Sequence, residues 1–148
     1  MEVDALNWQI LKCLHENARQ SNAQIGRTVG LTSPAVAERI KKMQDEGLIK
    51  GFTAKIDHNK TTNQLKAVIT LKAFMGRLKP FLAKVSDFKE VLNCYRITGN
   101  ENIIMEVVLR DQFHLEELID KLITYGETKT HIVLSHVVDN RLISENQI

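Results

Sequence analysis

The sequence predicts an α+β protein in two parts, a helical N-terminal part and a C-terminal part with the element order βαββαβ. Three observations support this fold class. Apolar residues recur at helical spacing in three short segments before Gly47. The spacing changes to an approximate alternation in residues 48–57, which predicts a strand, and residues 58–66 are polar without apolar anchors. Strand-like runs and two amphipathic helical patterns then fill the rest of the chain.

The first two predicted helices are short. Asp4 can cap a helix whose apolar pattern ends in residues 16–21. Ser21 or Asn22 can cap a second helix, which ends at Gly30 because glycine readily adopts the left-handed conformation of a helix C-terminus. Such a short helix buries little surface alone, so we expect it to hold the next helix at a steep angle.

A third helix follows the tight turn at residues 29–31. Thr32 or Ser33 can cap it, and Gly47 stops it. Its apolar stripe consists of Val36, Ile40 and Met43. The opposite face has small residues near the N-terminus and lysines further along, as expected of a helix that enters a DNA major groove with lysines near phosphates. That face carries Pro34, Ala37, Glu38, Lys41 and Asp45, flanked by Lys42.

The basic charge is concentrated in the N-terminal third. The net charge is only +2, but residues 19–60 hold eight basic and four acidic side chains, whereas residues 61–148 hold eleven of each. This excess favours a polyanionic partner, although a three-helix packing unit with a solvated charged face is the alternative. No apolar run approaches the ~20 residues of a membrane span, so we expect a cytoplasmic protein without membrane contact.

The C-terminal part has the order of a ferredoxin-like, split βαβ domain, an antiparallel sheet with two helices on one face. The predicted strands are residues 66–74, 90–98, 102–109 and 130–138, and the predicted helices are residues 78–88 and 114–126. The first and third strands are apolar at more positions than one helix-covered face requires. We therefore expect part of the other face to pack on a second chain, giving at least a dimer.

Catalytic and metal-binding motifs are missing from the sequence. The histidines show no HExxH or paired Cys/His spacing, and His131 and His136 would point to opposite faces of a strand. No GxSxG, GxxxxGK[ST] or GxGxxG motif occurs. We expect no enzyme, no metal and no cofactor.

Three stretches together resemble the Lrp/AsnC (leucine-responsive and asparagine-operon regulator) family along nearly the whole chain. They are IGRTVGLTSPAVAERIKKMQDEGLIKGF (residues 25–52), CYRITGNENIIMEVVL (residues 94–109) and TKTHIVLS (residues 128–135). The resemblance implies a winged helix-turn-helix domain in residues 1–57, a hinge in residues 58–66 and a RAM-type, effector-sensing domain in residues 67–148. It also implies homodimers that assemble to tetramers or octamers on double-stranded DNA, in the nucleoid of a prokaryote.

In that family the turn and the third helix carry the DNA contacts. They fall here on Thr32, Ser33, Pro34, Ala35, Ala37, Glu38, Arg39, Lys41 and Lys42. Arg39 lies toward the edge of the apolar stripe, so we interpret it as a phosphate contact. The predicted function is a sequence-specific transcriptional regulator. Two alternatives stay open, an architectural protein that wraps or bends DNA and a small-molecule sensor or assembly protein that does not bind DNA.

The predicted effector site departs from the family pattern, in which acidic residues often follow the loop glycine. The residues that match the site are Gly99, Asn100, Glu101, Asn102, Thr128 and Thr130. The ammonium of an amino acid prefers an anionic partner, whereas Asn102 offers only a neutral carbonyl. We therefore predict a weak or absent response to ordinary α-amino acids, with no effector or a different one.

Overall fold

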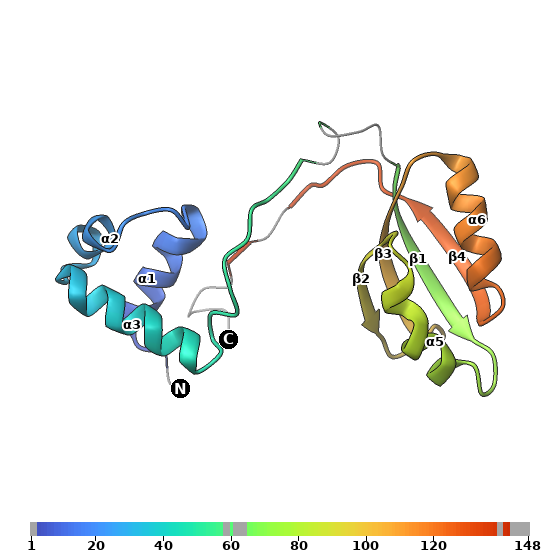
Figure 1. Ribbon diagram of the computed structural model, residues 1–148, viewed down its shortest axis with the longest axis horizontal. Coiled ribbons are helices and arrows are strands. Elements are labelled where there is room, and N and C mark those ends of the chain that lie inside the picture. Colours follow the sequence, from blue (N-terminus) through green and yellow to red (C-terminus); the bar gives the residue numbers. More distant parts are fainter. Residues whose placement is uncertain (1–2, 58–59, 61–64, 139–140, 143–148) are drawn as a thin grey trace. The chain divides into compact units, whose positions relative to one another are not determined.

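The computed structural model describes residues 3–57, 60, 65–138 and 141–142. The chain divides into two compact units (Figure 1), one built from residues 1–55 with the described residues of 138–148, and one from residues 56–137. The C-terminal residues thus group with the helical unit, which the sequence did not indicate. The functional domain limits at residues 57 and 67 stay predictions.

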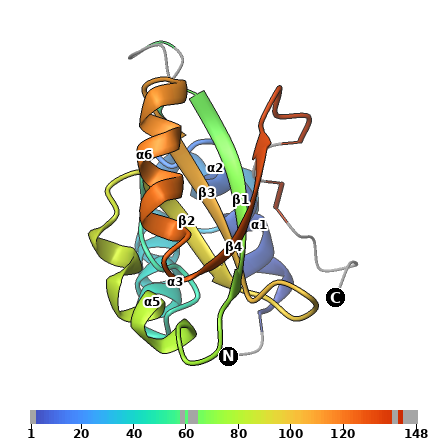
Figure 2. The same ribbon diagram turned by 90° about the vertical axis from the view of Figure 1, so that its right-hand side faces the viewer.

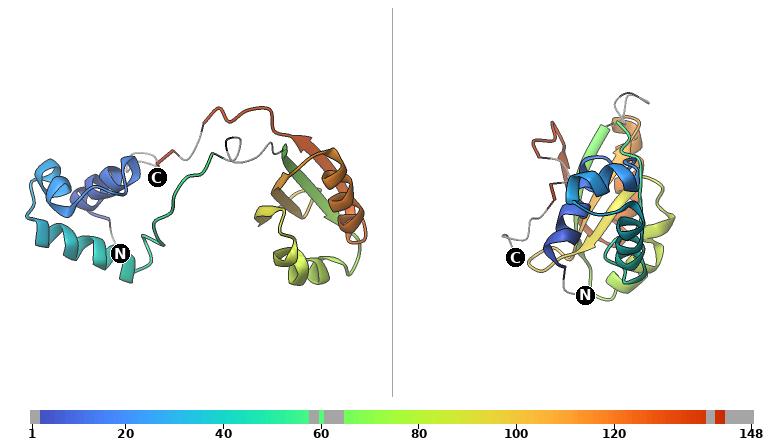
Figure 3. Two further views of the ribbon diagram at one scale, coloured as in Figure 1. Left: turned by 45° about the horizontal axis from the view of Figure 1, so that its top comes forward. Right: turned by 90° about the vertical axis from the view of Figure 1, so that its left-hand side faces the viewer.

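The helical unit contains the three predicted helices, visible together in Figure 3. They are α1 (Ala5–Glu16), α2 (Asn22–Val29) and α3 (Ser33–Asp45). Asp4, Ser21 and Thr32 cap them, since each side chain accepts a hydrogen bond from the backbone N–H three residues further on. Gly30 ends α2 with a φ of 72°. Local capping signals therefore define these helices correctly.

The core of this unit joins all three helices. Its buried side chains are Ile10, Cys13, Ile25, Val29, Val36 and Met43. Of the predicted stripe on α3, Val36 and Met43 are fully buried and Ile40 is half-buried. The stripe is confirmed, so the opposite face of α3 is the exposed one.

The turn between α2 and α3 depends on a glycine inside α2. A Cβ on the buried Gly26 would lie 2.4 Å from the carbonyl oxygen of Leu31. The Gly26 carbonyl in turn accepts a hydrogen bond from the Leu31 N–H at 2.9 Å. The backbone after α2 therefore folds back directly onto the helix, and only three residues separate α2 from α3.

The strand predicted in residues 48–57 is wrong. The structure describes all of these residues and assigns no strand to them. A strand needs a paired neighbour, and the rest of the helical unit is built from helices. Leu48, Phe52 and Ile56 are exposed in this segment. Alternation of apolar residues alone was an insufficient signal here.

The second unit has the predicted βαββαβ order. Its elements are β1 (Leu65–Ala73), α5 (Leu78–Lys84), the 3₁₀ helix η1 (Val85–Asp87), β2 (Val91–Arg96), β3 (Ile103–Leu109), α6 (Gln112–Leu122) and β4 (Gly126–Ile132). The sheet order is β2-β3-β1-β4, and every neighbouring pair is antiparallel. This is the ferredoxin-like arrangement that the sequence predicts.

Both helices cover the same face of the sheet (Figure 2). Phe81 of α5 and Leu118 of α6 belong to one buried cluster with Ile69 of β1 and Met105 of β3. The other face carries half-buried apolar side chains of the central strands. They include Val68, Ile104 and Val108. We call this second surface the open face.

The last strand lies earlier in the chain than predicted. We expected a helix through Gly126 and a strand in residues 130–138, whereas α6 ends at Leu122 and β4 covers Gly126–Ile132. The strand begins at Gly126, where the backbone lies very close to β1: a Cβ there would be 2.2 Å from the Lys72 carbonyl oxygen. The polar residues of β4 suit an edge strand, and the apolar run after Ile132 is not in the sheet.

Replacing Gly26 with alanine should destabilise the helical unit. The new methyl group meets a backbone carbonyl that a side-chain rotation cannot move, so we expect a loss of about 1–3 kcal/mol in unfolding free energy. The better helix propensity of alanine offsets at most ~1 kcal/mol. Denaturation followed by fluorescence of Trp8, the single tryptophan, measures the loss.

Thr28→Ala, an exposed change on the same helix, is the matched control and should alter stability by less than about 0.5 kcal/mol. Equal stabilities of the two variants would show that the close approach at Gly26 does not constrain the turn.

Candidate DNA-binding surface and effector site

The exposed face of α3 carries the residues that the sequence predicts as DNA contacts. Pro34, Glu38, Lys41 and Lys42 are exposed, and Ala37 is half-buried between them. Lys42 lies 3.9 Å from Glu46 one turn further on, a long contact between exposed groups. Among the described residues, no carboxylate pairs with Lys41. Its ammonium is thus available to an external anion.

The first turn of α3 combines capping with exposure. The Oγ1 atom of Thr32 accepts a hydrogen bond from the Ala35 N–H at 3.4 Å. A hydroxyl that accepts a bond keeps its own proton, which can be donated to a phosphate oxygen. Thr32 and Ser33 are exposed, whereas Ala35 is half-buried. The start of the helix can therefore approach a nucleic acid closely.

Arg39 has a different position from its neighbours on α3. Its Nη1 atom donates to Oδ2 of Asp4 at 2.7 Å and to Oδ1 of the buried Asn7 at 2.9 Å. These bonds join the middle of α3 to the start of α1. The sequence missed this pairing because the partners lie more than thirty positions apart, and nothing local in the chain indicates it.

The same contact changes the acidity of Asp4. The hydrogen bond from Arg39 is the main cause that lowers the pKa of the Asp4 carboxyl below its usual value of 3.8, and the hydrogen bond from the Asn7 N–H acts in the same direction. Asp4 thus has two functions, since it caps α1 and holds α3 through Arg39.

In the predicted effector loop, Asn102 is held by the backbone of β1. Its Oδ1 atom accepts the Ala73 N–H at 2.8 Å, and its own N–H donates to the Leu71 carbonyl at 2.9 Å. Gly99, at the tip of the same loop, has a φ of 118°, a conformation that favours glycine. The side-chain carbonyl of Asn102 therefore already has a partner within the sheet unit.

Glu101 is also engaged. Its Oε1 atom lies 2.7 Å from the Nζ atom of Lys129 on β4. The hydrogen bond from Lys129 is the main cause that lowers the pKa of Glu101, and the same bond raises the pKa of Lys129. Sequence reasoning missed Lys129 because it lies 28 positions from Glu101, on β4, which is separated from β3 by β1 in the sheet.

The two threonines lie on the other side of the sheet from Lys129. Thr128 pairs with Leu71 and Thr130 with Ile69, and both of these partners belong to the helix-covered core. Paired residues share a face, so both threonines, which are half-buried, point toward the helices. The structure therefore places both predicted threonines on the helix-covered face of β4, opposite to the face that carries Lys129, the partner of Glu101.

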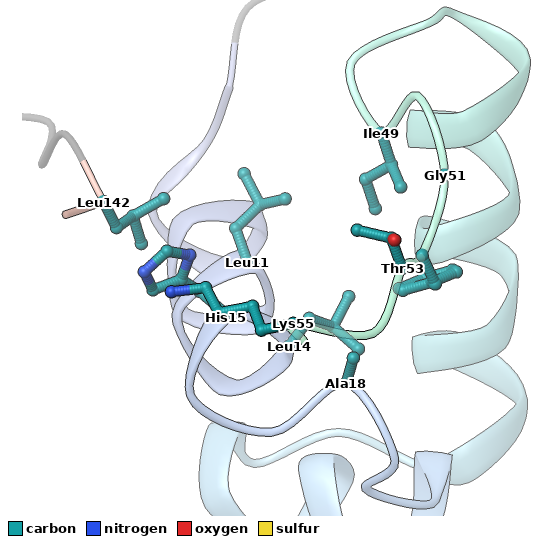
Figure 4. Close-up of a pocket in the computed structure, with 10 residues that line it drawn as sticks. Leu11, Leu14, His15, Ala18, Ile49, Gly51, Thr53, Lys55 and Leu142 are labelled. Carbon is teal, nitrogen blue, oxygen red and sulfur yellow. The ribbon is translucent and has the colours of Figure 1, made fainter. Parts of the chain in front are cut away.

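An open pocket of about 370 Å³ lies on the helical unit, where α1 faces residues 49–55 (Figure 4). None of the predicted site residues lines it. Its walls are formed by Leu11, Leu14, His15, Ala18, Ile49, Gly51, Phe52, Thr53, Lys55 and Leu142.

No helix in the described ranges is long and apolar enough to cross a membrane. Within the same ranges, His, Cys, Asp and Glu side chains form no group of three or more that could hold a metal ion.

Comparisons with known proteins agree with both units. Residues 3–44, which span the three helices, match the AsnC-type helix-turn-helix domain, and residues 66–143 match the Lrp/AsnC ligand binding domain. The chain belongs to the Lrp/AsnC family. It is therefore a DNA-binding transcriptional regulator of the Lrp/AsnC type, as the resemblance in its sequence implied.

Individual Lrp/AsnC proteins match nearly the full length. YezC of Bacillus subtilis, an uncharacterized HTH-type transcriptional regulator, is 33% identical over 133 residues, which cover 90% of this chain and 94% of YezC. The solved structure of B. subtilis LrpC has a TM-score of 0.88 at 24% identity and covers 95% of this chain and 100% of its own. NMB0573 of Neisseria meningitidis, solved with L-Met, has a TM-score of 0.89 at 22% identity, with 97% coverage of each chain.

The Asp4–Arg39 contact predicts a pH-dependent stability of the Lrp/AsnC helical unit. The pKa of Asp4 is lowered in the folded state, so its ionised form stabilises the fold above the unfolded value of 3.8, and this contribution is lost as the pH falls through the folded pKa. Asp4→Asn keeps a capping side chain but removes the charge. Its melting temperature, followed by Trp8 fluorescence, should lie below that of the wild type at pH 7.

The difference in melting temperature should shrink below a pH of about 3.8 as the wild-type carboxyl is protonated. A constant difference between pH 7 and pH 3 would show that the charge on Asp4 does not act through Arg39.

Proposed function

We propose that this regulator reads DNA with α3 in the major groove. The carrying observation is that the face opposite Val36 and Met43 is exposed at Pro34, Glu38, Lys41 and Lys42, while Lys41 has no carboxylate partner among the described residues. Ala37 and Glu38 lie where a groove-entering helix contacts base edges. Lys41 and Lys42, with Thr32 and Ser33 at the turn, are the phosphate contacts. This assignment follows the contact set that the resemblance implies, with Pro34 and Ala35 allowing close approach.

Arg39 receives a different role in this proposal. Its guanidinium donates to Asp4, the N-cap of α1, and to Asn7 within α1. Arg39 therefore positions α3 and does not contact a phosphate. Arg39 and Lys41, two basic residues on the same helix, should therefore fail in different ways when they are substituted.

Substitutions on α3 separate these roles. Lys41→Ala should weaken binding to all duplexes and reduce the slope of log affinity against log salt by about one. Substitutions at Ala37 or Glu38 should alter the preferred base by roughly 1–3 kcal/mol per lost contact. Arg39→Met should lower the melting temperature reported by Trp8 and leave the salt slope unchanged. Titrations on a specific and a scrambled duplex over a salt series measure all three.

Unchanged DNA affinity in the Lys41, Ala37 and Glu38 variants would remove α3 from the interface. Equal loss on the specific and scrambled duplexes at every position would favour the architectural, low-specificity alternative.

We propose a homodimer formed through the open face of the sheet. Val68, Ile104 and Val108 are apolar and half-buried there, although no helix of this unit covers them. The hydroxyl oxygen of Thr70, on the same face, is buried without a hydrogen-bond partner among the described residues. A dimer places two reading helices on half-sites about 34 Å apart, one DNA turn, which gives useful specificity. Tetramers or octamers would add further half-sites.

Ile104→Lys should break this dimer. Covering an unpaired ammonium in an apolar interface costs several kcal/mol, so the dissociation constant should rise at least roughly a hundredfold. Light scattering should give a dimer or larger species for the wild type and a 16.9 kDa monomer for the variant. Ile123→Lys changes an exposed isoleucine at the end of α6 and should leave the dimer intact. A monomeric wild type at micromolar concentration contradicts the proposal.

We propose that the loop around Gly99 is an effector site with poor affinity for ordinary α-amino acids. The carbonyl of Asn102 accepts the Ala73 N–H, and the carboxylate of Glu101 pairs with Lys129. Both acceptors are already engaged, so the ammonium of a zwitterion would have to compete with the Ala73 N–H or with Lys129. Thr128 and Thr130 offer hydroxyls only on the opposite, helix-covered face.

Asn102→Asp should restore amino-acid binding. An aspartate keeps the acceptor for Ala73 and adds a negative oxygen, which should raise affinity for at least one amino acid roughly ten- to a hundredfold. Calorimetry against the twenty amino acids measures this, with Asn100→Asp as a control of equal charge in the same loop. A wild-type dissociation constant below about 100 micromolar for any of them would refute the argument from Asn102.

A regulator that binds the chromosome acts where the chromosome lies. We therefore propose a cytoplasmic, nucleoid-associated location in a prokaryotic cell.

A further inference from the structure

One wall of the pocket on the helical unit is formed by Leu142, a side chain from the C-terminal part of the chain. Leu142 lies beside His15 and close to Leu11 of α1 (Figure 4). It is half-buried, whereas residues 134–138, which precede it, are all exposed. The chain is thus exposed at residues 134–138 and is partly covered again at Leu142.

We propose that Leu142 anchors the chain that returns from the sheet unit to its own helical unit, and that the apolar surface of α1 and residues 49–55, with which Leu142 lines the pocket, is its receptor. The pocket walls suit an apolar side chain, because Leu11, Leu14 and Ile49 already pack against the buried core of the unit. Covering a leucine there removes apolar surface of both partners from water.

The anchor gives the molecule a second connection between its units. The chain passes from the helical unit to the sheet unit after Lys55 and returns after Val137. With Leu142 held, both ends of the sheet unit are tethered, through the neighbouring strands β1 and β4. Two tethers restrict the helical unit more than a single tether does. When one helical unit of a dimer has bound its half-site, the second unit is therefore present at a higher effective concentration at the other half-site.

The anchor leaves the DNA-reading surface free. The residues that line the pocket belong to α1, to the chain after it and to residues 49–55, together with Leu142, and none belongs to α2 or α3. Anchoring and DNA binding are therefore compatible. We expect loss of the anchor to weaken specific DNA binding rather than to relieve an inhibition.

Cross-linking tests the anchor without DNA, so its result does not depend on the proposed function. The variant His15→Cys with Leu142→Cys is treated with a short bismaleimide, and His15→Cys with Leu134→Cys is the control pair, since Leu134 is 94% exposed. Chains of normal and heavy isotope composition are mixed and equilibrated before the reaction. Mass spectrometry identifies which cysteines are joined, so Cys13 and Cys94 can remain in place.

The proposal expects at least roughly tenfold more cross-link between positions 15 and 142 than in the control pair, with light peptides joined to light and heavy to heavy. Mixed light–heavy cross-links would overturn it, because the pocket would then receive the segment of a second copy. Equal cross-linking of both pairs would overturn it too, because Leu142 would then have no preferred place.

The effect on DNA binding is measured with Leu142→Asp and the matched control Leu134→Asp. We expect the first to weaken binding to a specific duplex roughly tenfold, and the second to stay within about twofold of the wild type. Equal affinities of the two variants, after a selective cross-link, would overturn the tethering role. A wild type that binds no DNA would overturn the proposed function while leaving the cross-linking result valid.

Discussion

The position of α3 and of its exposed face depends on the close approach between Gly26 and the carbonyl of Leu31. Because residue 26 has no Cβ, the chain leaves α2, turns at Gly30 and begins α3 three residues later, at Ser33. The short α2 then supports α3 at one fixed position, where Val36 enters the core. A wider turn would let the helix roll and bury part of its polar face. The exposed face of α3 is thus a consequence of backbone packing in the turn, before any of its own side chains contribute.

Long-range polar contacts complete what the turn begins. Arg39 connects the middle of α3 to the N-terminal cap of α1, so the helix is fixed near its start by the turn and near its centre by an ion pair. Asp4 is half-exposed, and pairs of this kind contribute modestly to stability. The Arg39 contact matters more for geometry than for stability, because hydrogen bonds from one guanidinium to two acceptors fix the rotation of α3 about its axis.

Local signals in the sequence predicted the helical unit and most of the sheet. Caps such as Ser21 and Thr32 act within three residues, and the apolar stripe of α3 repeats every turn. β4 was misplaced because its own local signal is weak. An edge strand is polar, so the exposed apolar run after Ile132 gave the stronger strand signal, while Gly126 resembled a helix terminus. Residue 126 is a glycine because a Cβ there would collide with the Lys72 carbonyl on β1. The sequence near Gly126 gives no sign of this contact with another strand.

The two candidate sites differ in how their cations are used, and this difference was not predictable from charge counts. Residues 61–148 hold equal numbers of basic and acidic side chains, and in this part Lys129 is paired with Glu101 at 2.7 Å. The N-terminal third holds an excess of basic residues, but they are not equivalent. Arg39 forms an ion pair with Asp4, whereas Lys41 has no carboxylate partner among the described residues. A phosphate is attracted most strongly to a cation whose field is not already neutralised by a carboxylate. The position of each lysine and arginine relative to its nearest carboxylate, and not the net charge of the unit, therefore determines which cations are left to attract an external anion.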